Sequence, residues 1–158
     1  MREWLKPIAA TAAAVAIAGG GVVVTSASGI SSPATTYTIH LTAVQTHERN
    51  FFTGPHGSPQ PGDHFVFQQQ LFYDAQQKHL AGFAFITCTF DFGNQTVCTA
   101  DATLYSRGTV VVEGISPNTN SFSLAITGGT EEFADAGGTA TVSGGGNHVQ
   151  TIVLRIDN

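Results

Sequence analysis

Three consecutive glutamines, Gln68 to Gln70, interrupt the apolar segment Phe65 to Phe72 and are the first place to look for chemistry. Successive side chains of an extended strand point to opposite faces, so amides occur on both faces and some point inward. Inward amides beside phenylalanine rings would form an apolar cavity with a few fixed polar groups, the usual composition of a small-molecule site. We therefore expect a ligand to contact Phe65, Phe67, Gln69, Phe83 and Phe85. The alternative is that the amides bond to neighbouring side chains and the interior is filled.

The two cysteines, Cys88 and Cys98, flank the turn sequence Phe92-Gly93-Asn94 almost symmetrically. In an antiparallel hairpin they would face each other across neighbouring strands, at a separation that suits a disulfide. An exported protein would also meet the oxidising conditions that such a bond needs. We predict a disulfide between them; the alternative is a nucleophilic thiol activated by a histidine.

The sequence contains six histidines, but no pair has the close spacing of a helical or finger-type ligand set. His47, His56 and His64 share one proline-rich segment and could converge, although solvated loop histidines are the simpler interpretation. The acids give no clearer signal, since Glu131 and Glu132 lie together in a turn sequence. We therefore expect no metal site.

Eight segments have the alternation and the β-branched or aromatic content that are typical of strands. The spacers between most of them are short and rich in turn residues, which indicates consecutive antiparallel hairpins. We predict an all-β, eight-stranded antiparallel up-and-down β-barrel, with a two-sheet sandwich as the alternative. Glycine pairs at 128–129 and 137–138 supply the backbone freedom that this architecture needs. The predicted strands are 37–44, 65–73, 81–90, 96–105, 108–114, 121–127, 138–143 and 149–156.

One spacer, Thr46 to His64, is much longer than the others and contains Pro55, Pro59 and Pro61. Proline cannot donate to a ladder, so the segment cannot be a central strand. We expect a long loop here, of the kind that often forms the rim of a binding cavity.

The chain has 158 residues, enough for one domain with a real core, and 42% of them are hydrophobic. Its formal net charge is −5, and Lys and Arg together number only 6. Nucleic acid is therefore not an expected partner, because binding to phosphates depends on many basic side chains.

The N-terminus has the organisation of an export signal. Arg2 and Lys6 precede an apolar run from Ile8 to Val24, and small residues follow at Thr25-Ser26-Ala27. We expect residues 1–27 to be a signal peptide, or alternatively an uncleaved membrane anchor helix, followed by a linker at 28–36 and a barrel domain at 37–158. The mature protein would be secreted, and it would meet a membrane only if the first segment were retained.

Motifs between Tyr37 and Ile156 resemble the allene oxide cyclase barrels and their dirigent-like relatives. The resemblance implies an eight-stranded antiparallel barrel with an apolar cavity and no cofactor. Members of that family cyclise a fatty-acid epoxide, steer the coupling of phenols, or fold polyketide intermediates into rings, and they include dimers and trimers, so a homo-oligomer is compatible with it. The motifs are Pro61-Gly62-Asp63, Cys88-Thr89-Phe90, Val111-Val112-Glu113-Gly114 and the stretch from Leu124 to Val142.

The resemblance also implies site residues. The plant cyclases carry a carboxylate two residues before an Asn-Glu-Arg triplet, and here these positions hold Gln45 and His47-Glu48-Arg49. A tyrosine position of the family falls on Ser116, its cysteine corresponds to Cys88, and its Ser-Pro pair corresponds to Ser58-Pro59. Because Gln45 removes a charge, the reaction of the plant enzymes is not expected. The candidate catalytic residues are Gln45, Glu48 and Tyr73, and Ser58 and Pro59 join the ligand-binding set.

Three functions follow from these observations. The first is an exported barrel that binds a hydrophobic small molecule in its cavity. The second is a cofactor-independent cyclase or dirigent-like isomerase that folds an apolar substrate. The third is a structural secreted domain whose interior is filled by phenylalanine side chains.

Overall fold

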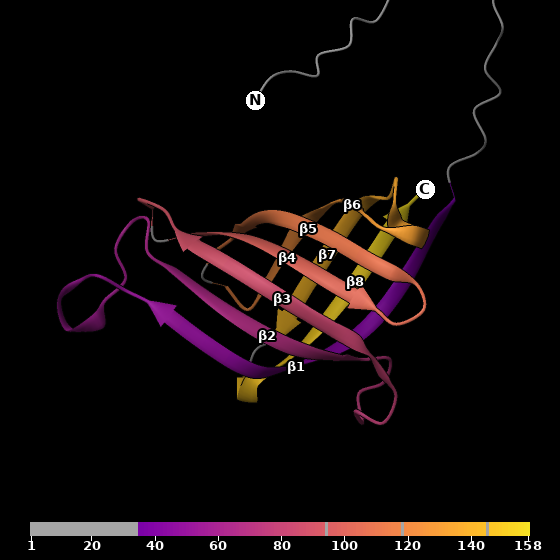
Figure 1. Cartoon of the computed structure of the whole chain (residues 1–158), viewed down its shortest axis with the longest axis horizontal. Helices are drawn as coiled ribbons and strands as arrows, with labels where there is room; N and C mark the ends of the chain where they lie inside the picture. The colour runs from indigo at the N-terminus through magenta and orange to yellow at the C-terminus, as the bar shows by residue number, and fades with distance from the viewer. Residues whose placement is uncertain (1–34, 94, 118, 145) are drawn as a thin grey trace, which may run out of the picture. The chain divides into compact units, whose positions relative to one another are not determined.

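Eight strands pair antiparallel in chain order, and β8 pairs back with β1 to close a barrel (Figure 1). The structure is a computed structural model, and it describes residues 35–158 except 94, 118 and 145. The closed sheet confirms the predicted all-β up-and-down barrel and rules out the two-sheet sandwich. The strands are β1 (Thr36–Phe51), β2 (His64–Phe72), β3 (Leu80–Phe90), β4 (Thr96–Leu104), β5 (Gly108–Ser116), β6 (Ser121–Gly129), β7 (Gly137–Gly144) and β8 (Val149–Asp157).

The predicted signal or anchor segment, 1–27, and the predicted linker up to residue 34 lie outside the described residues. Within residues 35–158, apart from the three positions already excepted, no helix is long and apolar enough to cross a membrane. Three short 3-10 helices lie between strands: η1 (Pro55–Gly57), η2 (Glu131–Phe133) and η3 (Gly146–His148).

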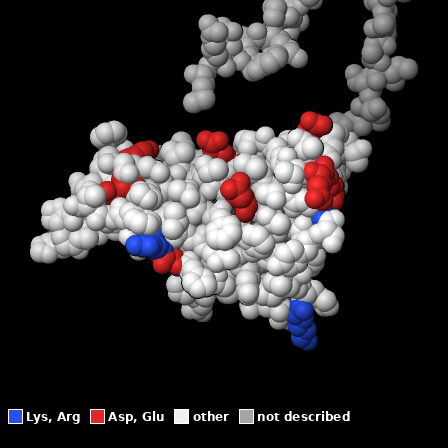
Figure 2. Space-filling view, in the orientation of Figure 1, with Lys and Arg blue, Asp and Glu red and all other residues white. Residues whose placement is uncertain are grey.

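Strand alternation explains where the core lies. In β6, for example, Leu124 and Ile126 are buried, whereas Ser123 and Ala125 between and beside them are exposed. The same period of two recurs around the barrel, so one set of side chains fills the interior and the other faces out. The outer face carries acidic side chains scattered over a largely uncharged surface (Figure 2).

The first strand is longer than the sequence predicts. β1 continues through Thr46 to Phe51, so the long loop spans only 52–63, and its three prolines lie within that shorter range. The extra residues are all exposed on both faces. A strand segment that buries neither face shows no alternation of apolar and polar residues, and this is why the sequence pattern misses it.

The loop at 52–63 is held by the carboxylate of Asp63. Asp63 is only 5% exposed, and it accepts hydrogen bonds from the Thr53 backbone N–H (2.9 Å), the Thr53 hydroxyl (2.8 Å) and the Gln60 backbone N–H (2.8 Å). The Thr53 backbone hydrogen bond is the main cause that holds the pKa of Asp63 below its ordinary value. The loop is therefore fixed to the start of β2.

The opposite end of the barrel is closed by η2. Phe133 is fully buried there. Arg107 donates from Nε to Glu132 Oε2 at 2.8 Å and from Nη2 to Glu132 Oε1 at 2.6 Å, and the Tyr37 hydroxyl donates to Glu132 Oε1 at 2.8 Å. The paired Arg107 guanidinium lowers the pKa of Glu132 to about 2. We call this the closed end, and the end that carries loop 52–63 the open end.

Backbone geometry at Gly138 permits the close packing of β7 on β8. Its φ is +123°, and a Cβ there would lie 2.0 Å from the Arg155 carbonyl oxygen. Only glycine fits such a position. This bears out for Gly138 the role that the sequence gives to the pair at 137–138, whereas a Cβ at Gly137 would meet nothing within 4 Å.

Candidate ligand-binding site

An apolar cavity of about 280 Å³ occupies the barrel interior between its middle and the open end. Its wall is built from the inward-facing residues of all eight strands. Glu48 lines the cavity and is exposed, so the cavity reaches solvent beside it. The apolar part of the wall is formed by Leu41, Phe65, Phe67, Leu71, Ala84, Ile86, Cys88, Cys98, Ala100, Ala102, Val112, Phe122, Leu124, Ala140, Val142, Ile152 and Leu154, and the polar part by Gln45, Glu48, Gln69, Ser116 and Gln150.

Two of the four predicted phenylalanines line this cavity. Phe65 and Phe67 lie on the inner face of β2, with ring centroids 5.9 Å apart and planes only 14° from parallel. Gln69, the next inward residue of β2, is 3% exposed and also lines the wall. The sequence therefore places the inner face of β2 correctly.

The structure places Phe83 and Phe85 elsewhere, on the outer face of β3. Residues that pair directly across an antiparallel ladder point to the same side of the sheet. The inward Phe67 pairs with Ile86 and the inward Gln69 pairs with Ala84, so Phe83 and Phe85, which alternate with these two residues along β3, must point outward. Phe85 is accordingly 53% exposed. The β2–β3 register decides this, and the sequence alone does not fix that register.

A β-bulge in β1 brings Gln45 and Glu48 to the same side. Gln45 pairs with Gln69 and Glu48 pairs with Phe67, so three residues of β1 advance against two of β2. Without the bulge, residues three apart would face opposite sides. Gln45 Nε2 donates to Glu48 Oε2 at 2.6 Å, which forms a hydrogen-bonded pair at the open end of the cavity.

A second polar pair lies deeper. Gln69 Nε2 donates to Gln150 Oε1 at 2.7 Å, across the barrel from β2 to β8. Gln69 is buried, so this partner satisfies an amide that would otherwise face an apolar wall. The site thus offers two amide groups inside and one amide–carboxylate pair at the mouth.

The remaining candidates are not part of this group. Tyr73 follows β2 at the closed end, is 44% exposed, and adjoins Arg107. Ser58 and Pro59 lie in the exposed loop at the open end, where the Ser58 hydroxyl donates to the Pro55 carbonyl at 2.9 Å. None of the three lines the cavity described by residues 35–158.

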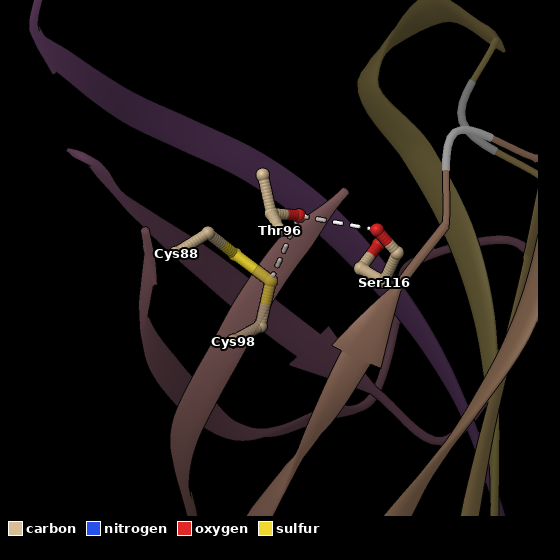
Figure 3. The surroundings of a disulfide bond; sticks show 4 residues. All are labelled: Cys88, Thr96, Cys98 and Ser116. Carbon is tan, nitrogen blue, oxygen red and sulfur yellow. Dashed lines mark hydrogen bonds between the residues drawn. A yellow bond between two sulfur atoms is a disulfide. The ribbon is translucent and has the colours of Figure 1, made fainter. Parts of the chain in front are cut away.

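Cys88 and Cys98 form a disulfide, as the sequence predicts, so the nucleophilic-thiol alternative falls away (Figure 3). The two residues are directly paired across β3 and β4, and both contribute to the cavity wall. The Thr96 hydroxyl lies 3.6 Å from Cys98 Sγ and donates to the Ser116 carbonyl at 3.2 Å, which links this hairpin to β5.

The histidines do not come together as the ligands of a metal site in the described residues. In the part of the chain that the structure describes, no three His, Cys, Asp or Glu side chains gather closely enough to hold a metal ion. His47, His56 and His64 lie near the open end on β1, η1 and β2 without converging.

Sequence reasoning missed most of the lining residues, Phe122 and Gln150 among them, and it named Ser116 only as a position implied by the family resemblance. Phe122 carried a signal, because it belongs to the alternating set of β6 that also contains Leu124 and Ile126. Gln150 carried none, since one amide at the start of a strand is indistinguishable from a surface residue until the ladder with β1 is known.

Several solved structures are similar to this barrel, as a comparison with known proteins shows. No protein-family model matches the chain, and no curated protein matches it. Pyocyanin demethylase is similar at 26% identity, covering 76% of this chain and 99% of that one, with a TM-score of 0.67. The pterocarpan synthase dirigent protein GePTS1 is similar at 16% identity, covering 78% of this chain and 89% of that one, with a TM-score of 0.59.

A third similar structure is the Diels-Alderase AbmU from Streptomyces koyangensis, at 17% identity, covering 79% of this chain and 70% of that one, with a TM-score of 0.57. At such identities the dirigent protein and the Diels-Alderase show a common fold alone. That fold bears out the resemblance found in the sequence motifs. The chain therefore has the fold of the dirigent-like barrels.

Proposed function

We propose that this protein binds an apolar small molecule inside its barrel. The observation that carries the proposal is the cavity of about 280 Å³, with an apolar wall and a few hydrogen-bonded polar groups. This is the usual composition of a small-molecule site. The structural alternative, an interior filled by phenylalanine side chains, is less well supported because Phe83 and Phe85 point outward.

The cavity volume limits the size of the ligand. An engineered apolar cavity of about 150 Å³ holds one benzene ring. A cavity of about 280 Å³ has room for two fused rings, and because it opens to solvent beside Glu48, a further substituent on the ligand can extend into the mouth. The Gln69–Gln150 pair would orient such a ligand by hydrogen bonds without adding charge.

The similar structures support this kind of function. Their names describe a demethylase for pyocyanin, a pterocarpan synthase and a Diels-Alderase, which are proteins that act on organic molecules. We further propose that the protein is exported, since the disulfide fits an oxidising compartment.

The test is a fluorescence titration with N-phenyl-1-naphthylamine, a neutral apolar probe. Ala100 lines the cavity on β4, and Ala100→Leu should fill part of the void and weaken probe binding by about tenfold or more. Ala125→Leu is the matched control, because Ala125 is exposed on the outer face of β6. The control should bind the probe as the unmodified protein does.

Two results would overturn the proposal. The first is an unmodified protein that does not bind the probe. The second is equal binding by both leucine variants and the unmodified protein, which would place the probe on the outer surface. Urea unfolding of each variant would show that the barrel is intact.

Catalysis is a second candidate function, favoured by the Gln45–Glu48 pair. A carboxylate that faces an apolar cavity and is held by one hydrogen bond is suited to act as a general acid or base. Pyocyanin is a first substrate to try, given the similarity to its demethylase. With any substrate that is turned over, Glu48→Gln should lower the rate at saturation by about a hundredfold or more. An unchanged rate would remove Glu48 from the mechanism.

A further inference from the structure

The charge of the cavity wall restricts which apolar molecules fit. Among the described residues that line the cavity, Glu48 is the one that ionises, and none is basic. An anionic group inside would meet no counter-charge and would approach a carboxylate at the mouth. A buried charge without a partner is costly, so an anionic ligand is disfavoured.

The bulge in β1 places the acidic side chain at the mouth on the inner face and the neighbouring basic side chains on the outer face. It turns Glu48 inward, while its sequence neighbours His47 and Arg49 pair with Gln68 and Val66 on the outer face. Arg49 lies over the ring of Phe51, with its guanidinium carbon 5.0 Å from the ring centroid. Phe51 in turn stacks on His64 at 4.5 Å. The carboxylate therefore faces the cavity without a cation from β1 to neutralise it.

Aromatic rings line the same cavity. Phe65 and Phe67 on β2 and Phe122 on β6 all belong to its wall. Phe67 is the direct ladder partner of Glu48, so a ring and a carboxylate border the same part of the mouth. Ring faces attract cations, and the attraction grows where water is excluded.

We propose that the ligand is an apolar organic cation, such as a fused aromatic ring that bears a substituted ammonium group. Its rings occupy the apolar cavity, and its charge lies at the mouth beside the Glu48 carboxylate and the Phe67 ring. Gln45 holds the carboxylate in place through its hydrogen bond to Oε2. This inference rests on the proposed binding function and names the chemical class of the ligand.

The test uses three probes of similar size: N,N,N-trimethyl-2-naphthylammonium, 2-tert-butylnaphthalene and 2-naphthoate. The first two have nearly the same shape and differ in charge, and the third is anionic. Each probe displaces N-phenyl-1-naphthylamine from the full-length protein, and the displacement gives its affinity. The measurement is repeated for Glu48→Gln and for Glu113→Gln, which removes an equal charge from the exposed outer face of β5.

We expect Glu48→Gln to lower the affinity for the cationic probe by about tenfold and to change the affinity for the neutral probe by less than about twofold. The affinity for the anionic probe should rise. Glu113→Gln should leave all three affinities as they are. Added salt should lower the affinity of the unmodified protein for the cationic probe, because salt screens the attraction between charges that are near solvent.

The outcomes separate this inference from the proposed function. Suppose that the neutral probe binds the unmodified protein, but Glu48→Gln lowers the affinities for the neutral and cationic probes equally or lowers neither. The proposed ligand class is then wrong, and the binding function stands. If the neutral probe does not bind the unmodified protein, the binding function itself fails. Retained neutral binding by Glu48→Gln shows that the variant is folded.

Discussion

The amides of Gln69 and Gln150 meet inside an apolar wall, and this pairing makes each residue dependent on the other. Gln69 is buried, and its Nε2 lies 2.7 Å from Gln150 Oε1. A buried amide that keeps its partner contributes little net stability, whereas one that loses its partner is destabilising. The intact pair therefore adds little to the stability of the barrel, and under the proposed binding function its role would be to orient the ligand.

Removing one amide should show this dependence. We expect Gln69→Leu to lower the free energy of unfolding by about 1 kcal/mol, because Gln150 is left without its donor. The double variant Gln69→Leu/Gln150→Leu should recover most of that loss, and urea unfolding of the single and double variants measures both. Additive losses in the double variant would mean that the two amides act independently.

Residue types alone could predict part of the site. The inward set of β2, with Phe65, Phe67 and Gln69, follows from alternation within a single strand. The placement of Gln45 beside Glu48 does not, since an undisturbed strand would point them to opposite faces. Their resemblance to a family motif singled them out, and the bulge opposite Gln69 and Phe67 supplies the physical reason.

At the scale of elements, the two ends of the barrel are built differently. The β3–β4 hairpin at the open end is joined by the Cys88–Cys98 disulfide. With a sequence separation of 10, the bond contributes roughly 2–3 kcal/mol by restricting the unfolded chain. The closed end is held instead by η2, with Phe133 inserted and Glu132 bound by Arg107 and Tyr37.

The charge cluster at the closed end predicts a dependence on pH. The pKa of Glu132 lies at about 2 in the folded protein and at 4.5 ordinarily, because Arg107 donates hydrogen bonds to the carboxylate. A lowered pKa gives a stabilisation that is complete above pH 4.5 and is lost as the pH falls towards 2. Glu132 is 37% exposed, so solvent screening limits the contribution to about 1 kcal/mol.

Glu132→Gln should therefore be less stable than the unmodified protein at neutral pH, and the two should converge as the pH falls from 4.5 to about 2. Thermal unfolding across that range measures the difference. Glu131→Gln is the matched control, since Glu131 is exposed, adjoins Glu132 in the chain and makes no ion pair among the described residues. A difference between Glu132→Gln and the unmodified protein that persists at the lowest pH would contradict this account.

Element boundaries show what local patterns can reveal. The starts and ends of β2 to β8 fall within one or two residues of their predicted positions, because turn-forming residues lie between these strands in the sequence. The end of β1 does not, since Thr46 to Phe51 bury neither face and carry no periodic signal. That missed segment holds Glu48, so the most informative acid of the site lies where the pattern is weakest.

At the scale of the whole barrel, closure explains why an interior void persists. Each strand has two hydrogen-bonded neighbours, so the sheet has no free edge and keeps its shape without complete filling. Large side chains such as Phe133 fill the closed end, and small ones such as Ala84, Ala100 and Ala140 leave space near the middle. The eight-stranded count was predictable from strand and turn signals, but the position of the void depends on register and could not be read from them.

The most direct test of the central claim is where an apolar molecule lies when bound in solution. Intermolecular nuclear Overhauser effects between N-phenyl-1-naphthylamine and the alanine methyl groups would locate it. Our account predicts contacts with Ala84, Ala100 and Ala140 inside the barrel and none with Ala125 on the outer face. Contacts confined to Ala125 and to the outward rings of Phe83 and Phe85 would contradict it and would move the binding site to the outside of the sheet.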